Sequence, residues 1–364
     1  MKKIFPLVIA LLVSSFSFSQ STYFITGQVV DGNTGAPMMA ASVFAENTTI
    51  GTATDAEGKF RLELPNGGYS LVISFTGYQS ERRRITTASA DDKNMMIALN
   101  LKQKEMEDVV VRSSAEVADG LEKYGSFFLD NFIGKTANSK ECYISNKDVL
   151  HFFFYKKRNK LKVTATAPLE IVNNALGYRV RYELDSFVHE YNTELSLYTG
   201  YPRFEEMKPQ SDAEHTKWET NRQKAYNGSV LHFMRSLYNK RLREEGFEIQ
   251  FLVKDNDKES TVPVKNFYGA LNYKMDDSTH TVEVWPNQND VAILYKNETP
   301  DEGYIEANPE QPKKFELSVF SFLPRQSIII EQNGFYFEQT DFTINQYLGW
   351  EKMADMLPYD YIIK

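Results

Sequence analysis

The stretch from Lys59 to Leu64 alternates strictly between charged and apolar side chains. Its apolar residues share one face of an extended segment and its charged residues share the other, which is the period of a half-buried β-strand. Turn-forming residues flank it, Asp-Ala-Glu-Gly at 55–58 and Pro-Asn-Gly-Gly at 65–68, where glycine permits positive φ. The sequence therefore predicts a short strand between two tight turns.

Similar short runs recur on either side of this strand, separated by turn-forming residues. We expect further strands at 24–30, 41–46, 49–54, 69–75, 80–86 and 95–101. Roughly seven short strands at such regular spacing predict an all-β sandwich, which we place at residues 20–101.

A combined pattern of short motifs runs through this sandwich. The motifs are Thr26–Asp31, Gly35–Pro37, Ala41–Val43, Gly51–Thr52, Thr54–Asp55, Gly58–Phe60 and Phe75–Tyr78. Together they resemble the carboxypeptidase regulatory-like domain, common in envelope proteins of Bacteroidetes-type bacteria, over about 80 of the 364 residues. The resemblance implies a transthyretin-like (prealbumin-like) sandwich and an envelope setting. It implies no peptidase activity, because this domain is the non-catalytic companion of the enzymes that gave it its name.

The first 19 residues have the pattern of a secretory signal peptide. Lys2 and Lys3 precede an apolar run from Ile4 to Val13, and small residues at 17 and 19 suit cleavage after Ser19. A membrane anchor is the alternative, but the apolar run is too short to span a bilayer. We therefore expect an exported chain, in the periplasm or associated with the outer membrane.

The composition limits the classes of partner and site. A net charge of −8 and a pI near 5.4 argue against nucleic acid, which requires a basic surface. Cys142 is the only cysteine, so an intrachain disulfide and a cysteine-based metal site are both excluded. The 21 Tyr and 25 Phe suit β-rich domains and also carbohydrate- or protein-binding surfaces. No cofactor, no metal and no later transmembrane helix are expected.

Residues 102–120 are polar and small, which predicts a linker. Within it, the segment from Glu107 to Val111 resembles the stretch that follows this same sandwich in TonB-dependent receptors. There it lies near the segment that couples to the energising partner by strand addition. The chain after it is too short for a plug and a large barrel, so a receptor is not expected. Asp108–Val111 is either a docking strand or an ordinary final strand of the sandwich.

Residues 121–364 predict a β-rich α+β region of unknown function, with a possible subdivision near 255. Helices are expected at 121–133, from about 212, at 229–245 and at 350–357. Strands are expected at 141–144, 149–156, 160–167, 169–172, 178–190, 191–200, 248–253, 266–273, 281–285, 291–295, 314–323, 327–331 and 335–338, with an acidic loop at 299–312.

A second resemblance concerns this region. The segments Leu129–Gly134, Ala175–Tyr178, Tyr198–Phe204 and Trp218–Phe247 look like a set of envelope proteins. In that set a regulatory-like sandwich precedes a region with no established activity. The resemblance supplies no catalytic residues.

Several groups of residues have side chains that could form a chemical site. His280 and Glu283 match H-x-x-E, but no third ligand follows and a strand would place them on opposite faces. Cys142 is expected to be a buried structural thiol. Asp185 with His189 and Glu190, or Glu205 with Glu206, could form acid/base pairs. Arg235, Lys240, Arg241 and Arg243 form either an anion-binding surface or a solvated helix face. Asp255–Asp257 and Asp276–Asp277 are expected to be turns.

We therefore predict no catalytic, cofactor or metal residues. The leading hypothesis is a non-enzymatic envelope protein that binds another envelope protein or a polysaccharide. One alternative is a secreted hydrolase of glycans or peptides with its site in 121–364. Another is an accessory to TonB-linked uptake acting through residues 108–111.

Overall fold

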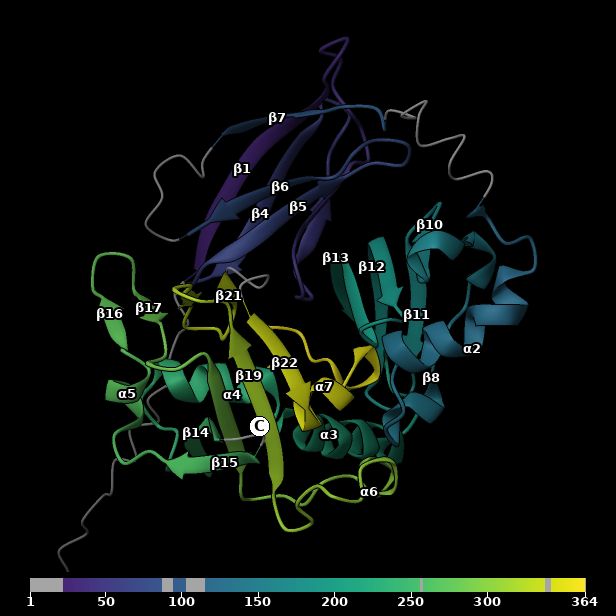
Figure 1. Ribbon diagram of the computed structural model, residues 1–364. Coiled ribbons are helices and arrows are strands. Elements are labelled where there is room, and N and C mark those ends of the chain that lie inside the picture. Colours follow the sequence, from purple (N-terminus) through teal and green to yellow (C-terminus); the bar gives the residue numbers. More distant parts are fainter. Residues whose placement is uncertain (1–21, 87–93, 103–114, 256–257, 338–341, 364) are drawn as a thin grey trace, which may run out of the picture.

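The computed structural model describes residues 22–86, 94–102, 115–255, 258–337 and 342–363. The predicted signal peptide and the predicted strand at 108–111 lie outside these residues. Figure 1 shows the N-terminal sheets above two further groups of strands, one around β12 and one around β19. Among the described residues, no helix combines the length and the apolar character needed to cross a bilayer.

The N-terminal sandwich consists of two sheets that enclose an apolar core, which confirms the predicted fold of this part. One sheet has the order β4-β1-β7 and the other β3-β2-β5-β6. The strands are β1 (Thr22–Asp31), β2 (Ser42–Ala45), β3 (Gly51–Ala53), β4 (Lys59–Pro65), β5 (Tyr69–Ser74), β6 (Glu81–Ile85) and β7 (Met95–Leu99). The alternation of β4 places Phe60, Leu62 and Leu64 in the core.

Close packing between β1 and β4 depends on a glycine. Gly27 pairs with Phe60 across the two antiparallel strands. A Cβ atom at Gly27 would lie 2.6 Å from the Phe60 ring and 2.6 Å from the Met95 carbonyl oxygen. Only glycine leaves room for both neighbours.

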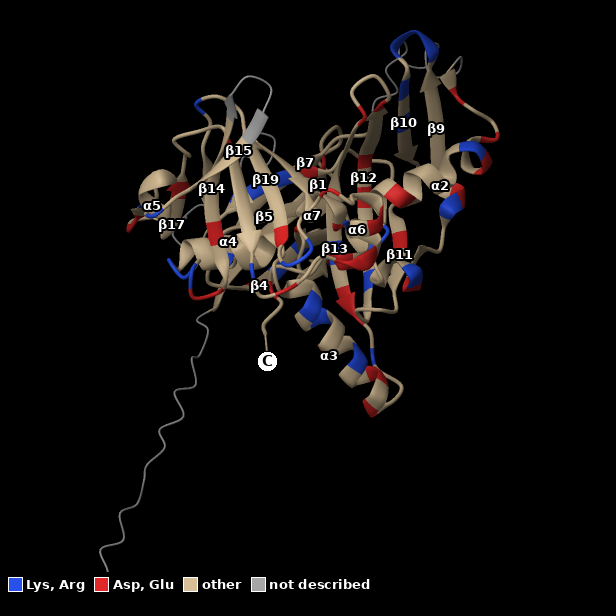
Figure 2. Cartoon of the chain, turned by 60° about the horizontal axis from the view of Figure 1, so that its bottom comes forward, with Lys and Arg blue, Asp and Glu red and all other residues tan. Residues whose placement is uncertain are grey.

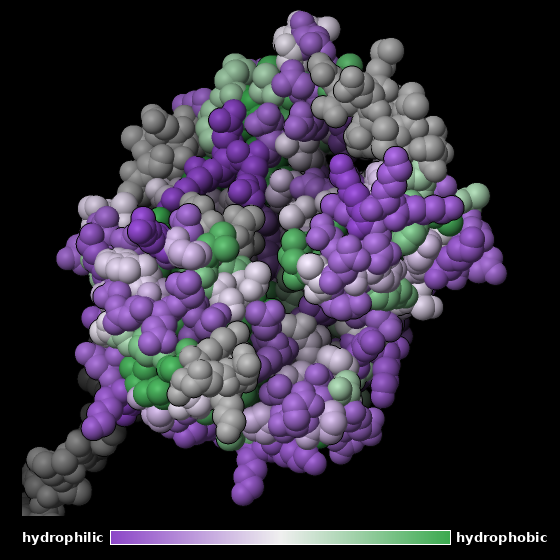
Figure 3. All heavy atoms as spheres, viewed as in Figure 1, coloured by the Kyte–Doolittle hydropathy of each residue, from purple (hydrophilic) through white to green (hydrophobic). Residues whose placement is uncertain are grey.

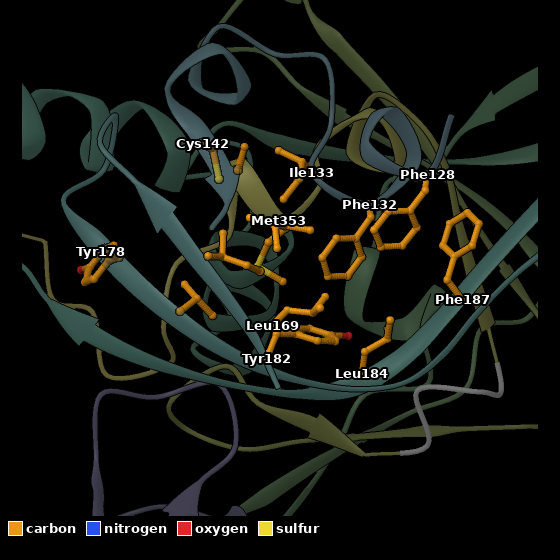
Figure 4. Packing of buried hydrophobic residues seen from close by; sticks show 14 of the residues in the cluster. Phe128, Phe132, Ile133, Cys142, Leu169, Tyr178, Tyr182, Leu184, Phe187 and Met353 are labelled. Atoms are coloured by element: carbon orange, nitrogen blue, oxygen red, sulfur yellow. The ribbon is translucent and has the colours of Figure 1, made fainter. Parts of the chain in front are cut away.

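The central sheet follows, in the order β8-β11-β12-β10-β9, with β13 paired to β12. Its strands are β8 (Cys142–Ile144), β9 (Leu150–Tyr155), β10 (Lys160–Ala165), β11 (Leu169–Asn173), β12 (Tyr178–Glu190) and β13 (Leu195–Glu206). The predicted helix is α2 (Gly120–Phe132), and Gly134 behind it takes φ +109°. Figure 4 shows rings of α2 meeting the sheet: Phe128 stacks on Phe132 and meets Phe187 edge to face, each at 5.2 Å.

The C-terminal sheets form a third core around Phe233, Phe247 and Phe320. One sheet has the order β15-β14-β18-β19-β22 and the other β16-β17-β20-β21. The strands are β14 (Phe247–Asp255), β15 (Lys258–Pro263), β16 (Lys274–Asp276), β17 (Thr281–Val284), β18 (Asp290–Tyr295), β19 (Glu316–Phe322), β20 (Ile328–Ile330), β21 (Tyr336–Phe337) and β22 (Phe342–Gln346). The helices are α3 (Asp212–Tyr226), α4 (Val230–Tyr238), α5 (Phe267–Ala270), α6 (Glu302–Ala307) and α7 (Tyr347–Trp350). Because β14 and β15 pair across position 255, that position lies within a sheet.

Five elements differ from the sequence-based expectation. The helix expected at 350–357 does not form, because α7 ends at Trp350 and only Met353–Asp355 make a 3-10 turn. The helix expected at 229–245 ends at Tyr238, and Lys240 beyond it takes φ +56°. The strand expected at 266–273 is the short helix α5, because the Asn266 side chain accepts a hydrogen bond from Gly269 N at 3.1 Å. The loop expected at 299–312 contains α6, which Asp301 caps in the same way. Residues 191–194 are a turn, and β13 runs on from there to Glu206.

Candidate binding site between the sandwich and the central sheet

The turn between β2 and β3 joins the sandwich to the rest of the molecule through backbone hydrogen bonds. Asn47 N donates to Pro202 O at 2.7 Å, and Phe204 N donates to Thr48 O at 2.9 Å. Tyr359 N donates to Asn47 O at 2.7 Å on the other side. Thr48 is completely buried. The turn therefore extends the β13 edge of the central sheet, and the sandwich is not merely tethered to it.

Side chains reinforce this attachment at two further places. Asp360 accepts hydrogen bonds from the backbone N–H of Thr49, at 3.0 Å, and from its hydroxyl. Glu331 accepts one from Gly68 N at 3.1 Å and lies 3.8 Å from the guanidinium of Arg84. The Arg84 guanidinium also lies 3.6 Å from the centre of the Phe337 ring. The sandwich thus contacts both the central sheet and the part of the chain from 331 to 360, which we call the C-terminal segment.

We call the contact between the sandwich and the sheets below it the seam. A polar cleft of about 550 Å³ lies beside it, and we call this the seam cleft. One wall is the loop at 74–80 of the sandwich, and the other is the face of β12 and β13 that points away from the α2 core. The lining side chains include Tyr78, Lys102, Arg181, Glu183, Asp185 and Tyr201. In the space-filling view, hydrophilic residues dominate the surface where the sandwich meets the lower sheets (Figure 3).

Carboxylates and cations both reach the seam cleft and its surroundings. Glu183 crosses the seam, accepting hydrogen bonds from Ser74 Oγ and, at 2.8 Å, from Ser80 Oγ. Burial raises the pKa of Asp185, partly offset by a hydrogen bond from Tyr201. Burial also raises the pKa of Glu46, which lies just behind the cleft, to about 7. The positive charge of Arg82 lowers this pKa in part. This mixture of fixed donors and acceptors suits a polar partner.

The structure separates the predicted pair of Asp185 and His189. A β-bulge between Leu184 and Ser186 shifts the register of β12, so Asp185 faces the seam cleft while His189 is buried in the α2 core. The His189 ring lies 2.8 Å from Ser196 Oγ, and burial lowers its pKa. Glu190 points outward, 3.6 Å from Lys160. The three residues therefore do not form one acid/base site.

The remaining sequence candidates also lie apart. His280 sits in a turn at φ +54°, and Glu283 accepts a hydrogen bond from Ser327 at 3.1 Å. Burial raises the pKa of the Cys142 thiol to about 12, as expected for a structural thiol. Across the part of the chain that the structure describes, no three His, Cys, Asp or Glu residues group as metal ligands.

Two more candidate groups are engaged in surface contacts. Glu206 pairs with Arg222 at 2.9 Å. The basic residues at 235–243 do not share a helix face, because α4 ends at Tyr238; Arg241 pairs with Glu245 and Arg243 covers Phe267. Figure 2 shows lysine, arginine and acidic residues intermixed, with a basic turn of residues 156–158 between β9 and β10. A solvated surface is the better interpretation of Lys240, Arg241 and Arg243. Arg235 is instead half-buried and donates to Asn333 O at 2.9 Å and to Tyr359 O at 3.0 Å.

Sequence reasoning missed most residues of the seam cleft. These residues come from distant parts of the chain, namely Ser74, Glu183 and Tyr201 at the cleft and Glu46 behind it. Each looks like an ordinary polar position of a strand or turn. Of the cleft residues, the sequence singles out Asp185 alone, as part of an acid/base pair. The one local indication is that Glu46 directly follows the apolar strand β2 and precedes the turn that the structure inserts into the seam.

Comparisons with known proteins concern the sandwich. Residues 25–111 match the family model described as CarboxypepD_reg-like domain. TonB-dependent receptor SusC from Bacteroides thetaiotaomicron is 36% identical over 80 residues, which is 22% of this chain and 8% of the receptor. TonB-dependent receptor P39 from Formosa agariphila is 28% identical over 106 residues, 29% of this chain and 10% of the receptor. These matches thus cover about a tenth of each receptor's length or less.

A solved structure gives a weaker match. A Bacteroides fragilis protein of unknown function aligns with a TM-score of 0.19 at 15% identity, over 45% of this chain and 65% of that one. That score is too low to bear on the fold. The family model, in contrast, confirms the resemblance found in the motifs: residues 25–111 are similar to the CarboxypepD_reg-like domain.

Proposed function

We propose that this chain is a non-enzymatic envelope protein that serves as an interaction module in a TonB-linked assembly at the outer membrane. The observation that carries this proposal is the seam cleft, whose walls come from the sandwich and from β12 and β13 together. The match of the sandwich to TonB-dependent receptors supports the envelope setting. The predicted signal peptide at 1–19 and export to the periplasmic side agree with it.

The walls of the seam cleft favour a polypeptide partner. Asp185 supplies an acceptor, while Arg181 and Lys102 supply donors. A peptide backbone presents both kinds of group in alternation. Tyr78 and Tyr201 add aromatic surface of the kind that is enriched at protein interfaces. A polysaccharide is the alternative occupant, and the experiment separates the two.

Site-specific photo-crosslinking in intact cells tests the proposal. A photoreactive residue replaces Thr76, which is exposed at the cleft, and in a matched control replaces Thr220, which is exposed on α3. We expect a crosslinked envelope protein at position 76 only. Crosslinking to glycan at position 76 would favour the polysaccharide, and equal products at both positions would overturn the assignment of the cleft.

A charge reversal refines this test. Lys102 lines the cleft and is exposed, so Lys102→Glu should lower the crosslink yield without unfolding the protein. Lys313→Glu reverses a charge on the exposed loop before β19 and serves as the control. The same decrease with both variants would show that net charge, and not the cleft, determines binding.

The hydrolase alternative requires two carboxyl groups in one deep pocket. Glu351 and Asp355 line a common cavity, and burial raises the pKa of Asp355 to about 6. However, both oxygens of Asp355 accept hydrogen bonds from Thr136 Oγ1 at 2.9 Å, and one also accepts from Asn138. Asp355 is thus held by the protein, and we expect no turnover of glycans or peptides. A hydrolytic rate that Glu351→Gln abolishes would contradict this proposal.

A role as an accessory to TonB-linked uptake is a narrower form of the same proposal. It depends on residues 108–111, which lie outside the described part of the chain. Deleting these four residues should remove any crosslink to an energising partner while the crosslink at position 76 persists. If crosslinking to that partner were unchanged, residues 108–111 would not be the docking strand.

A further inference from the structure

A second cavity, of about 290 Å³, lies where all three groups of sheets meet. We call it the junction cavity. The β2–β3 turn contributes Asn47, the central sheet contributes Tyr198, and the N-terminal end of α4 contributes Val230. The C-terminal segment contributes Leu348, Glu351 and Tyr359. It is separate from the seam cleft, with which it shares no lining residue.

Glu351 is the unusual group in this cavity. Within the described part of the chain, its carboxyl group makes no hydrogen bond and no ion pair. Burial raises its pKa well above the usual range, and the neighbouring Asp355, Glu316 and Glu298 raise it further. A carboxyl group held in this way is costly unless something pairs with it.

Lys352 lines the same cavity, but within the described part of the chain no ion pair joins it to Glu351. Lys352 follows it in an extended segment, so the two side chains point to opposite sides. Enclosure by protein lowers the pKa of Lys352, and its Cβ lies 3.1 Å from the point where a Cβ on Gly134 would be. Asp355 is already held by Thr136 and Asn138. Glu351 therefore faces the cavity uncompensated.

The second unsatisfied group at the wall is also an acceptor. Asn47 Oδ1 is buried and accepts no hydrogen bond from any described residue. The other walls are aromatic and aliphatic, with Tyr198, Tyr336 and Tyr359 beside Val230 and Ile344. An occupant that matches these walls needs a positively charged donor at one end and an apolar or aromatic body at the other.

We propose that the junction cavity binds a small organic amine, whose ammonium group pairs with Glu351 and whose apolar body packs among the tyrosines. A primary ammonium supplies three donors to the carboxylate, and tyrosine faces attract cations. Taking about 30 Å³ per water, the cavity volume corresponds to roughly ten waters, which suits an amine the size of phenylethylamine. A bare divalent ion would need more ligands than Glu351 alone.

Isothermal titration calorimetry on the full chain tests amine binding with three matched aromatic probes and one aliphatic pair. They are 2-phenylethylamine, 2-phenylethanol and 3-phenylpropionate, with n-hexylamine and 1-hexanol as an aliphatic pair. We expect both amines to bind at least tenfold more tightly than the alcohols, and the carboxylate to bind least. Equal affinities for amine and alcohol, or no binding of any amine, would overturn the proposal.

Two variants distinguish the site from non-specific binding. Glu351→Gln removes the charge at constant size, so it should reduce amine affinity at least tenfold and leave alcohol binding unchanged. Val230→Phe fills the cavity and should weaken amine and alcohol alike, which keeps the test decisive if Glu351→Gln fails to fold. Glu302→Gln, at an exposed site on α6, is the control and should bind as the wild type does. Amine affinity that survives both cavity variants would contradict the assignment.

Discussion

At the scale of single residues, Glu46 shows how burial at the seam changes the pKa of a carboxyl group. Its carboxyl group is enclosed between the sandwich and β12, which raises its pKa from 4.5 to about 7. The folded protein therefore retains a proton that the unfolded chain releases above about pH 4.5. The contribution of Glu46 to stability is complete below that pH and is lost as the pH rises through 7.

We predict that Glu46→Gln stabilises the protein at pH 8 by on the order of 2 kcal/mol, because the amide needs no deprotonation in a buried site. Urea unfolding at pH 5 and pH 8 measures the effect, which should shrink at pH 5. Glu57→Gln, at an exposed turn of the sandwich, is the control and should change neither value. A stabilisation of equal size at both pH values would exclude burial of Glu46 as the cause.

At the scale of elements, the long β12–β13 hairpin depends on its turn. Residues 191–194 link the two strands, and Glu194 takes φ +53°, a conformation that glycine adopts without strain. Glu194→Gly should therefore stabilise the protein by roughly 0.5–1 kcal/mol, less a small loss from its contact with His189 at 3.8 Å. Glu190→Gly, at the last residue of β12, should instead destabilise it by about 1 kcal/mol. Thermal unfolding measures both effects. If the melting temperatures of the two variants shifted in the same direction, this account of the turn would be refuted.

The hairpin also shows what the sequence could predict. Alternation over 178–190 predicts β12 with the bounds it has in the structure, because periodicity is a local property. The bulge beside Asp185 is not visible in that alternation, and it changes which side chains share a face. The contacts that form the seam, such as Glu183 with Ser74 and Ser80, join residues more than 100 positions apart. Local patterns therefore identify strands here but not the site between them.

At the scale of the whole molecule, the seam should make the sandwich and the sheets below it unfold together. The β2–β3 turn is hydrogen-bonded to both β13 and the C-terminal segment. Asp360→Ala removes the acceptor of two Thr49 hydrogen bonds, which should lower stability by about 1–3 kcal/mol. Differential scanning calorimetry should show one transition for the wild type and a broadened or divided one for the variant. Asp148→Ala, at an exposed position, is the control and should leave the single transition intact. Two separate transitions in the wild type would mean that the seam does not couple the sandwich to the sheets below it.

The bond between Thr49 and Asp360 spans 311 positions of the chain, and this has a consequence for biogenesis. A ribosome adds roughly 5–20 residues per second, so about 15 to 60 seconds separate the synthesis of its two ends. During that interval the sandwich can assemble from its own strands, but its β2–β3 turn still carries hydrated polar groups. The contact between the β2–β3 turn and Asp360 can therefore form only after residue 360 has been made, well after the sandwich strands.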